Sequence, residues 1–153
     1  MASFVFDKFK QHLFGGLINL HAQNTRYKLA LMVPDAQTNQ DGDLPLASYD
    51  TWTALVAQGE WVEVANGNGY ATGGKTLGHC VVSESSGVTT FDNTDDSDTT
   101  WTAATFSARI GVLYDITGGA QYLIRIFDFL ETKTVTAGTF AVNMNASGIL
   151  TAT

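Results

Sequence analysis

One segment of the chain has residue types and spacing that can bind nucleotide phosphates. Residues 69–76 read Gly-Tyr-Ala-Thr-Gly-Gly-Lys-Thr and match the P-loop pattern. In a P-loop, backbone N–H groups and a lysine hold the phosphates, and a hydroxyl binds magnesium. Residues 124–128, Ile-Arg-Ile-Phe-Asp, loosely imitate the strand that supplies an acidic magnesium partner. The cofactor-binding positions of this hypothetical NTPase would be Gly69, Gly74, Lys75 and Thr76.

The context of this segment argues against phosphate chemistry. A P-loop leaves a buried parallel strand and opens a helix, so that backbone N–H groups and the helix dipole converge on the phosphates. Residues 64–68, upstream, read as a turn, and residues 77–82, downstream, lack a helical apolar stripe. We therefore interpret the match as accidental and assign no cofactor to it. We expect a glycine-rich surface loop between two strands, with Tyr70 as its anchor and Lys75 in solvent.

Two other groups of polar residues could hold a metal, but their spacing is poor. The acidic run at residues 92–98 lacks the central glycine and the distant glutamate of an EF-hand, so we favour a solvated loop over a calcium site. His12, His21 and His79 are far apart in the sequence and show no metal-ligand spacing. We expect each to lie on a surface or a helix face, and we predict no metal.

The tryptophans and the cysteine also favour structural roles. Trp52, Trp61 and Trp101 could line a carbohydrate site, although large aromatic residues are usually core and interface anchors. Cys80 is the single cysteine, which excludes an intrachain disulfide, and we expect it to be a small buried residue in a strand. No G-x-S-x-G nucleophile motif is present. We predict that the chain is not an enzyme and has no catalytic residues.

The composition describes one ordinary globular domain with few charges. At 153 residues, the chain is expected to form a single domain, residues 1–153, that buries roughly 70% of its unfolded surface. Hydrophobic residues make up 44% and charged residues 15%, against about 25% charged in typical domains. Much of the polar surface must therefore be Thr, Ser, Asn and Gln, which favour strands and turns over helix interiors.

The charge balance and hydropathy limit the partners. The net charge of −7 and the pI near 4.6 oppose attraction to a phosphate backbone, and the basic residues are scattered. We therefore expect no direct nucleic-acid binding. The sequence also lacks a secretory leader and an apolar run of roughly 18 residues. We expect no membrane partner, and a chain that folds in a cytoplasm or ends in a particle assembled there.

The last third of the chain has the period of a β-sheet. From residue 106 to 114 the even positions are apolar and the odd ones mostly polar, with Leu113 as the misfit. Gly118-Gly119 suits a tight reversal into a second extended run, residues 121–129, and a third run covers residues 139–144. We predict a mainly β fold, a single antiparallel β-sandwich or jelly-roll-like domain. An immunoglobulin-like order and a barrel stay open.

Shorter elements are expected in the first two thirds. A helix through Phe6, Phe9 and Leu13 is expected to be capped by Ser3 and ended by Gly15-Gly16. The other expected elements are a second short helix at 48–57, strands at 17–21, 27–33 and 61–65, and a hairpin of residues 77–85 and 88–92 that turns at 85–87.

The order of these residues resembles a group of small structural proteins of tailed bacteriophages, described as head-decoration (cement) or virion proteins. The likeness spans nearly the whole chain. Two departures are Lys75, since relatives do not reliably carry lysine after the glycine pair, and the high charge of residues 95–98. The likeness to these phage proteins lies in the following segments: the Phe-containing helix ending at Gly15-Gly16, residues 27–32, Gly69-Tyr70, Gly73-Gly74, 101–109, 112–115, Asp128-Phe129, 134–140 and Gly148-Ile149.

This resemblance implies a non-enzymatic capsid decoration protein on the outer head surface of a virion. It implies binding to the major capsid protein and self-association, which we expect to give a homotrimer. The alternatives are a tail or baseplate component and, in another class, a carbohydrate-binding β-sandwich for host adsorption. The phenylalanines of the N-terminal segment could instead cap only the chain's own core. The predicted interface residues are Phe4, Phe6, Phe9, Leu13, Trp52 and Trp61.

Overall fold

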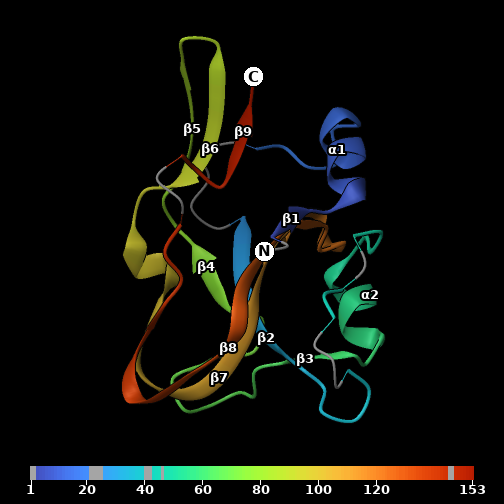
Figure 1. Cartoon of the computed structure of the whole chain (residues 1–153). Helices are drawn as coiled ribbons and strands as arrows, with labels where there is room; N and C mark the ends of the chain where they lie inside the picture. Colours follow the sequence, from blue (N-terminus) through green and yellow to red (C-terminus); the bar gives the residue numbers. More distant parts are fainter. Residues whose placement is uncertain (1–2, 21–25, 40–42, 46, 145–146) are drawn as a thin grey trace.

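The computed structural model describes residues 3–20, 26–39, 43–45, 47–144 and 147–153, and most of the ordered elements are strands (Figure 1). The helices are α1 (Asp7–Phe14), α2 (Trp52–Ala57) and the short 3-10 turns η1 (Asp96–Thr99) and η2 (Thr117–Gly119). The strands are β1 (Phe4–Val5), β2 (Tyr27–Pro34), β3 (Trp61–Glu63), β4 (Lys75–Leu77), β5 (Cys80–Ser85), β6 (Val88–Asn93), β7 (Thr100–Asp115), β8 (Leu123–Ala141) and β9 (Leu150–Ala152).

The strands form two antiparallel sheets. The larger sheet has the order β1-β8-β7-β2-β3, with β4 also paired to β2, and the smaller one has the order β5-β6-β9. The prediction of a mainly β, antiparallel, sandwich-like fold with a few short helices is confirmed. None of the helices among the described residues has the length and apolar character needed to cross a bilayer.

The large sheet buries both of its faces. One hydrophobic cluster contains Leu29 and Leu31 of β2 and packs against Phe91 of the small sheet. The other contains Ala30 and Met32 of β2 and packs against α2. Because side chains alternate along a strand, a central strand covered on both sides reads as a continuous apolar run, which is what the residues from 29 to 32 do.

Burial of both faces of β7 explains the misfit in the alternating pattern. Between Ala108 and Ile110 the register with β8 shifts, so Ala108 faces the first cluster and Ile110 faces the second. Leu113 then falls on the Ala108 side, where it packs in the first cluster. The sequence pattern implied one apolar face; the strand uses two.

The hairpin turn is confirmed, but the division into three runs is wrong. Gly118 and Gly119 both have positive φ in the reversal between β7 and β8. Most of the second expected run and the first half of the third belong to β8, which is one strand from Leu123 to Ala141, while residues 142–144 lie beyond its end. An irregular stretch near Leu130, whose φ is +69°, interrupts the apolar pattern without ending the strand.

Most of the shorter elements agree with the sequence. The helices end near Gly15 and Gln58, and Ser86 and Gly87 turn the β5–β6 hairpin with positive φ. Three details are wrong. The hairpin begins at Cys80, since Leu77 belongs to β4 of the large sheet. Ser3 does not cap α1, because its hydroxyl accepts a hydrogen bond from the Asp128 N–H at 2.9 Å. Residues 17–20 form no strand, and His21 lies outside the described residues.

Candidate interaction surface

The P-loop-like segment forms a loop between two strands, as the sequence context predicts. Gly67 and Tyr70 exchange two backbone hydrogen bonds of 2.8 and 2.9 Å in a tight turn. A second turn brings the chain into β4, which pairs with β2 instead of opening a helix. The segment therefore lacks the helix N-terminus that holds phosphates in a P-loop.

The glycines of this loop allow close packing against the large sheet. A Cβ atom on Gly69 would lie 2.9 Å from the Ala104 Cα, and one on Gly74 would overlap the Leu29 carbonyl group. Gly74 also has a φ of +75°, a conformation that glycine adopts without strain. The glycine spacing that imitates a nucleotide site thus serves contact with the backbones of β2 and β7.

Tyr70 anchors the loop, as predicted. β3 and β4 pair with opposite ends of β2, and the buried Tyr70 hydroxyl bridges the gap between them. It accepts a hydrogen bond from the Leu31 N–H at 3.0 Å and donates one to Glu63 Oε1 at 2.8 Å. Burial raises the pKa of Tyr70 far above its usual range, so the hydroxyl keeps its proton at neutral pH.

Lys75 is not solvated, and this prediction is wrong. Its Nζ donates hydrogen bonds to the carbonyl oxygens of Ser97 at 2.7 Å and Thr100 at 2.6 Å, at the end of η1. The ammonium also lies 5.9 Å from the centroid of the Trp101 ring. Asp128, the imitated magnesium ligand, pairs with Arg109 instead. The residues of the motif are therefore engaged in structural contacts.

The acidic run also bonds to its own chain. Asp98 Oδ2 accepts hydrogen bonds from the Gly78 N–H at 2.6 Å and the His79 N–H at 3.0 Å, and it lies 3.1 Å from His79 Nδ1. Asp95 accepts from the Ser97 N–H and caps η1. The residues that the structure describes contain no cluster of three or more metal-ligating side chains.

His12 has a structural position on the inner face of α1. Its ring is buried, contacts the carboxylate of Asp50 and lies against Tyr122 with 4.1 Å between ring centroids. This contact joins α1 to the segment before α2 and to β8. The expectation of a helix-face histidine is confirmed.

The tryptophans belong to the protein core. Trp52, Trp61 and Trp101 are all buried. Sugar-binding aromatics present an open ring face that a pyranose can cover, and no tryptophan of this chain does so. Cys80 is buried as expected.

Four of the six predicted interface residues are also core residues. Phe9 packs in the first cluster, and Phe6, Trp52 and Trp61 pack in the second. Side chains this buried in the single chain have little surface left for a partner, so their assignment to an interface is corrected. Phe4 and Leu13 keep part of their surface exposed and stay candidates.

An apolar groove lies between α1 and the small sheet, and we call it the α1–β9 groove. It has a volume of about 420 Å³. Figure 1 shows α1 and the β5-β6-β9 sheet on either side of it. Its apolar lining consists of Val5, Phe9, Leu13, Phe14, Leu20, Val82, Phe91 and Leu150.

Two exposed apolar residues lie at the end of α1 and just beyond it, and the first of them lines the groove. Phe14 is 87% exposed and Leu17, three residues later, is 52% exposed. Sequence reasoning missed Phe14 because it sought the buried stripe of the helix. The available signal was its position: Phe14 follows Leu13 directly and so points about 100° away from that stripe.

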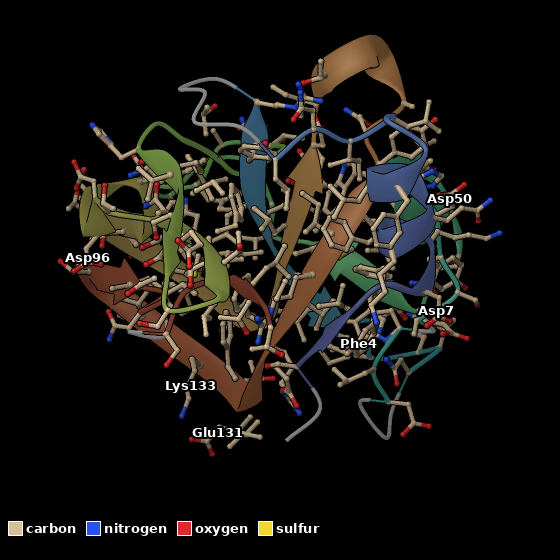
Figure 2. The ribbon with its side chains drawn as sticks, turned by 90° about the horizontal axis from the view of Figure 1, so that it is seen from above. Phe4, Asp7, Asp50, Asp96, Glu131 and Lys133 are labelled. Carbon is tan, nitrogen blue, oxygen red and sulfur yellow. The ribbon has the colours of Figure 1, made fainter. Side chains whose placement is uncertain are left out.

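Charged side chains lie elsewhere on the surface. Figure 2 shows Asp7 and Asp50 on one side of the molecule, Asp96 on the opposite side, and Glu131 beside Lys133 on a third. Lys133 Nζ and Glu131 Oε1 are 2.5 Å apart. The groove thus contrasts with its surroundings, since Lys10 is the one charged residue of its lining.

Comparison with known proteins gives no match: no family model, no curated protein and no solved structure corresponds to the chain.

Proposed function

We propose that the chain is a non-enzymatic virion protein of a tailed bacteriophage that decorates the head and stabilises the capsid shell. The observation that carries the docking part is the α1–β9 groove with Phe14 and Leu17 exposed beside it. Removing such apolar surface from water favours association by about 25 cal/mol per Å². The assignment to a bacteriophage head rests on the sequence resemblance.

Several properties of the chain support an adhesive role over a catalytic one. The motif that suggested an NTPase is a packed turn whose lysine bonds to two carbonyl groups. The tryptophans that suggested a lectin are buried. An acidic molecule with one apolar surface can bind a shell through that surface while its charged exterior keeps particles apart.

In this proposal the partners are the major capsid protein and further copies of the chain. Phe14, the last residue of α1, and Leu17, three residues beyond it, are both exposed, so a neighbouring surface can reach them without unfolding any element. A homotrimer at a local symmetry axis would bury three such contacts at once.

The decisive experiment measures copy number and location in purified particles. Quantitative mass spectrometry and cryo-electron microscopy of the encoding phage are expected to find on the order of hundreds of copies on the outer head surface. If the copies are confined to the tail, the protein is a tail or baseplate component and not a head-decoration protein. Absence from particles would overturn the proposal.

A matched pair of variants tests the docking surface. Phe14→Ser removes the exposed side chain at the groove, whereas Leu130→Ser removes a similarly exposed one (62%) from β8. In co-sedimentation with particles that lack the protein, Phe14→Ser is expected to bind at least about tenfold more weakly, and Leu130→Ser as wild type. Equal binding of both variants would exclude this surface.

A further inference from the structure

A second cavity lies on the other face of the large sheet, beneath α2. Its volume is about 680 Å³, and its lining comes from five separate segments of the chain. Helix α2 supplies Trp52 and Val56, β2 supplies Lys28, β7 supplies Tyr114, and the glycine-rich loop supplies Gly73. We call it the α2 pocket. It is distinct from the α1–β9 groove and shares no lining residue with it.

One side of the α2 pocket is apolar and preformed. The rings of Trp52 and Tyr114 stack with centroids 4.9 Å apart and planes 6° apart. Val56, 39% exposed, stands at the mouth of the pocket. A donated hydrogen bond of 2.7 Å from the Tyr114 hydroxyl to the Gly73 carbonyl oxygen fixes the loop against this wall.

The base of the pocket holds a cation without a partner in the described part of the chain. Lys28 pairs with Tyr114 in the β2–β7 register, and a Cβ atom on Gly73 would lie 3.3 Å from its Nζ. No described carboxylate lies within ion-pair distance of this ammonium group, and no described acceptor receives a hydrogen bond from it. The ammonium can therefore bind an anionic group that enters the pocket.

A carboxylate stands on the same side of the sheet. Glu63 Oε1 accepts hydrogen bonds from the Gly73 N–H and the Tyr70 hydroxyl, and no residue in the described ranges donates to its second oxygen. A carboxylate accepts about four hydrogen bonds in total. The pocket thus presents one positive and one negative group beside an apolar wall.

This combination selects the chemistry of the ligand. A purely cationic ligand would leave Lys28 without a partner, and a dianionic phosphate would meet stronger repulsion from Glu63 than a single carboxylate does. A single carboxylate can bind Lys28 while a neighbouring N–H donates to Glu63. An apolar side chain on the same molecule would then cover the exposed side chain of Val56.

We propose that the α2 pocket binds an α-carboxylate that carries an N–H group and an apolar side chain. Two sources share this chemistry, a free apolar amino acid and the C-terminal residue of a polypeptide. Capture of a terminal carboxylate is a known mode of peptide recognition.

Amide-resolved NMR titration of the full chain tests the proposal. The probes are N-acetyl-L-leucine, which imitates a peptide end, and L-leucine, with N-acetyl-L-leucinamide and inorganic phosphate as controls. We expect one or both carboxylates to give saturating shifts at Gly73 and at the Trp52 indole, in the millimolar range usual for ligands of this size. The leucinamide and phosphate are expected to bind at least about tenfold more weakly.

The relative affinity of the two carboxylates identifies the source. Tighter binding of N-acetyl-L-leucine favours a peptide end, and tighter binding of L-leucine favours a free amino acid. The absence of saturating shifts with both up to about 20 mM would overturn the proposal.

Two variants separate a built site from adventitious binding. Lys28→Met keeps the aliphatic stem and removes the charge, and it is expected to weaken carboxylate binding at least about tenfold. Lys8→Met, an equal charge change at an exposed position of α1 outside both the pocket and the groove, is expected to leave binding unchanged. Val56→Trp fills the mouth of the pocket from solvent and is expected to abolish the shifts with Lys28 in place. Unaltered affinity in Lys28→Met or in Val56→Trp would overturn the proposal.

Discussion

At the scale of single residues, Gly16 and Gly74 form a natural matched pair. Their φ angles are +74° and +75°, but a Cβ atom on Gly16 meets open space while one on Gly74 overlaps the backbone of β2. We predict that Gly16→Ala lowers the free energy of unfolding by about 1 kcal/mol, the cost of the backbone conformation alone. Gly74→Ala is expected to cost at least about 3 kcal/mol, because the loop must also move.

Urea unfolding followed by tryptophan fluorescence measures both variants. Equal losses of stability in the two alanine variants would show that the contact between the loop and β2 contributes nothing. A larger loss for Gly74→Ala would establish that glycine at this position of the P-loop pattern is needed for packing.

Cys80 predicts a loss of stability in alkaline solution. Burial raises the pKa of its thiol from 9.0 to about 12, and the charges of Asp98 and Asp92 act in the same direction. A thiol with a raised pKa stabilises the fold fully below its unfolded pKa, and this contribution declines as the pH rises toward the folded pKa. The free energy of unfolding should therefore fall above about pH 9, by at most about 1.4 kcal/mol per pH unit from this group.

Urea unfolding of wild type and Cys80→Ala between about pH 8 and pH 10 checks this linkage. The variant is expected to be less stable at pH 8, since it leaves a small cavity, but to show a flatter pH dependence. If the free energy of unfolding falls with pH at the same rate in both proteins, Cys80 does not cause the alkaline loss of stability. The buried tyrosines Tyr70 and Tyr114, whose pKa values burial also raises, should titrate only at higher pH.

Residue-scale roles could be predicted where the local sequence determines them. The anchoring by Tyr70 and the burial of Cys80 follow from apolar character next to a turn or within a strand. The partners of Lys75 could not be predicted, because Ser97 and Thr100 lie more than twenty residues away in the sequence and meet it only in the folded chain. Long-range contacts of this kind leave no repeating pattern in the sequence from which they could be predicted.

At the scale of elements, the β7–β8 hairpin divides into two halves. From Ile110 to Tyr114, β7 lies between β2 and β8 and is fully enclosed. From Thr100 to Ala108 it pairs only with β8, and residues 130–134 of β8 are exposed. A two-stranded ribbon has less support than a strand inside a sheet.

We predict a matching gradient in hydrogen exchange. Amides in residues 131–137 of β8 should exchange by local opening, at least about a hundredfold faster than the β7 amides of residues 110–114. Exchange measured by NMR on the isolated chain checks this. Uniform protection along β7 would mean that the outer half of the hairpin is covered, for example by another copy of the chain.

Element prediction succeeded where one period persists and failed where it breaks. The hairpin of β5 and β6 and its Ser86-Gly87 turn could be read directly, because the alternation and the turn residues agree. In β7 the apolar side chains change from one face to the other where the register shifts between Ala108 and Ile110, and in β8 the extra residues near Leu130 interrupt the pattern. A single-sequence pattern cannot separate such an interruption from the end of a strand.

At the scale of the whole molecule, the charge determines how copies meet. Each copy carries a formal net charge of −7, so neighbouring copies repel one another in dilute salt. We predict that self-association strengthens when the ionic strength rises from about 20 to 200 mM, because the Debye length falls below about 10 Å. Sedimentation velocity at fixed protein concentration measures this.

Phe14→Ser separates the apolar contribution to self-association from the electrostatic one. Phe14→Ser leaves the net charge unchanged, so copies of the variant repel one another as wild-type copies do. If wild type associates at high salt and the variant stays monomeric, the contact lies at the α1–β9 groove. Association that weakens with salt in wild type would contradict the prediction and indicate an interface held by opposite charges.

The overall architecture was predictable only as a class. Composition and period indicated antiparallel strands, but nothing local tells that β2 is buried on both faces or that the small sheet closes one of them. The α2 pocket is likewise built from five separate segments, and neither Lys28 nor Glu63 has a neighbouring sequence signal. Sites assembled by long-range pairing become visible only with the fold.

The β5–β6 hairpin offers a practical route to labelling. It projects from the body of the molecule (Figure 1), and nothing lies within 4 Å of a Cβ atom placed on Gly87 at its tip. Exposed loop tips of this kind tolerate added residues well. A short epitope inserted between Ser86 and Gly87 would report the orientation of the bound protein to an antibody while β1 and β9 stay paired in their sheets.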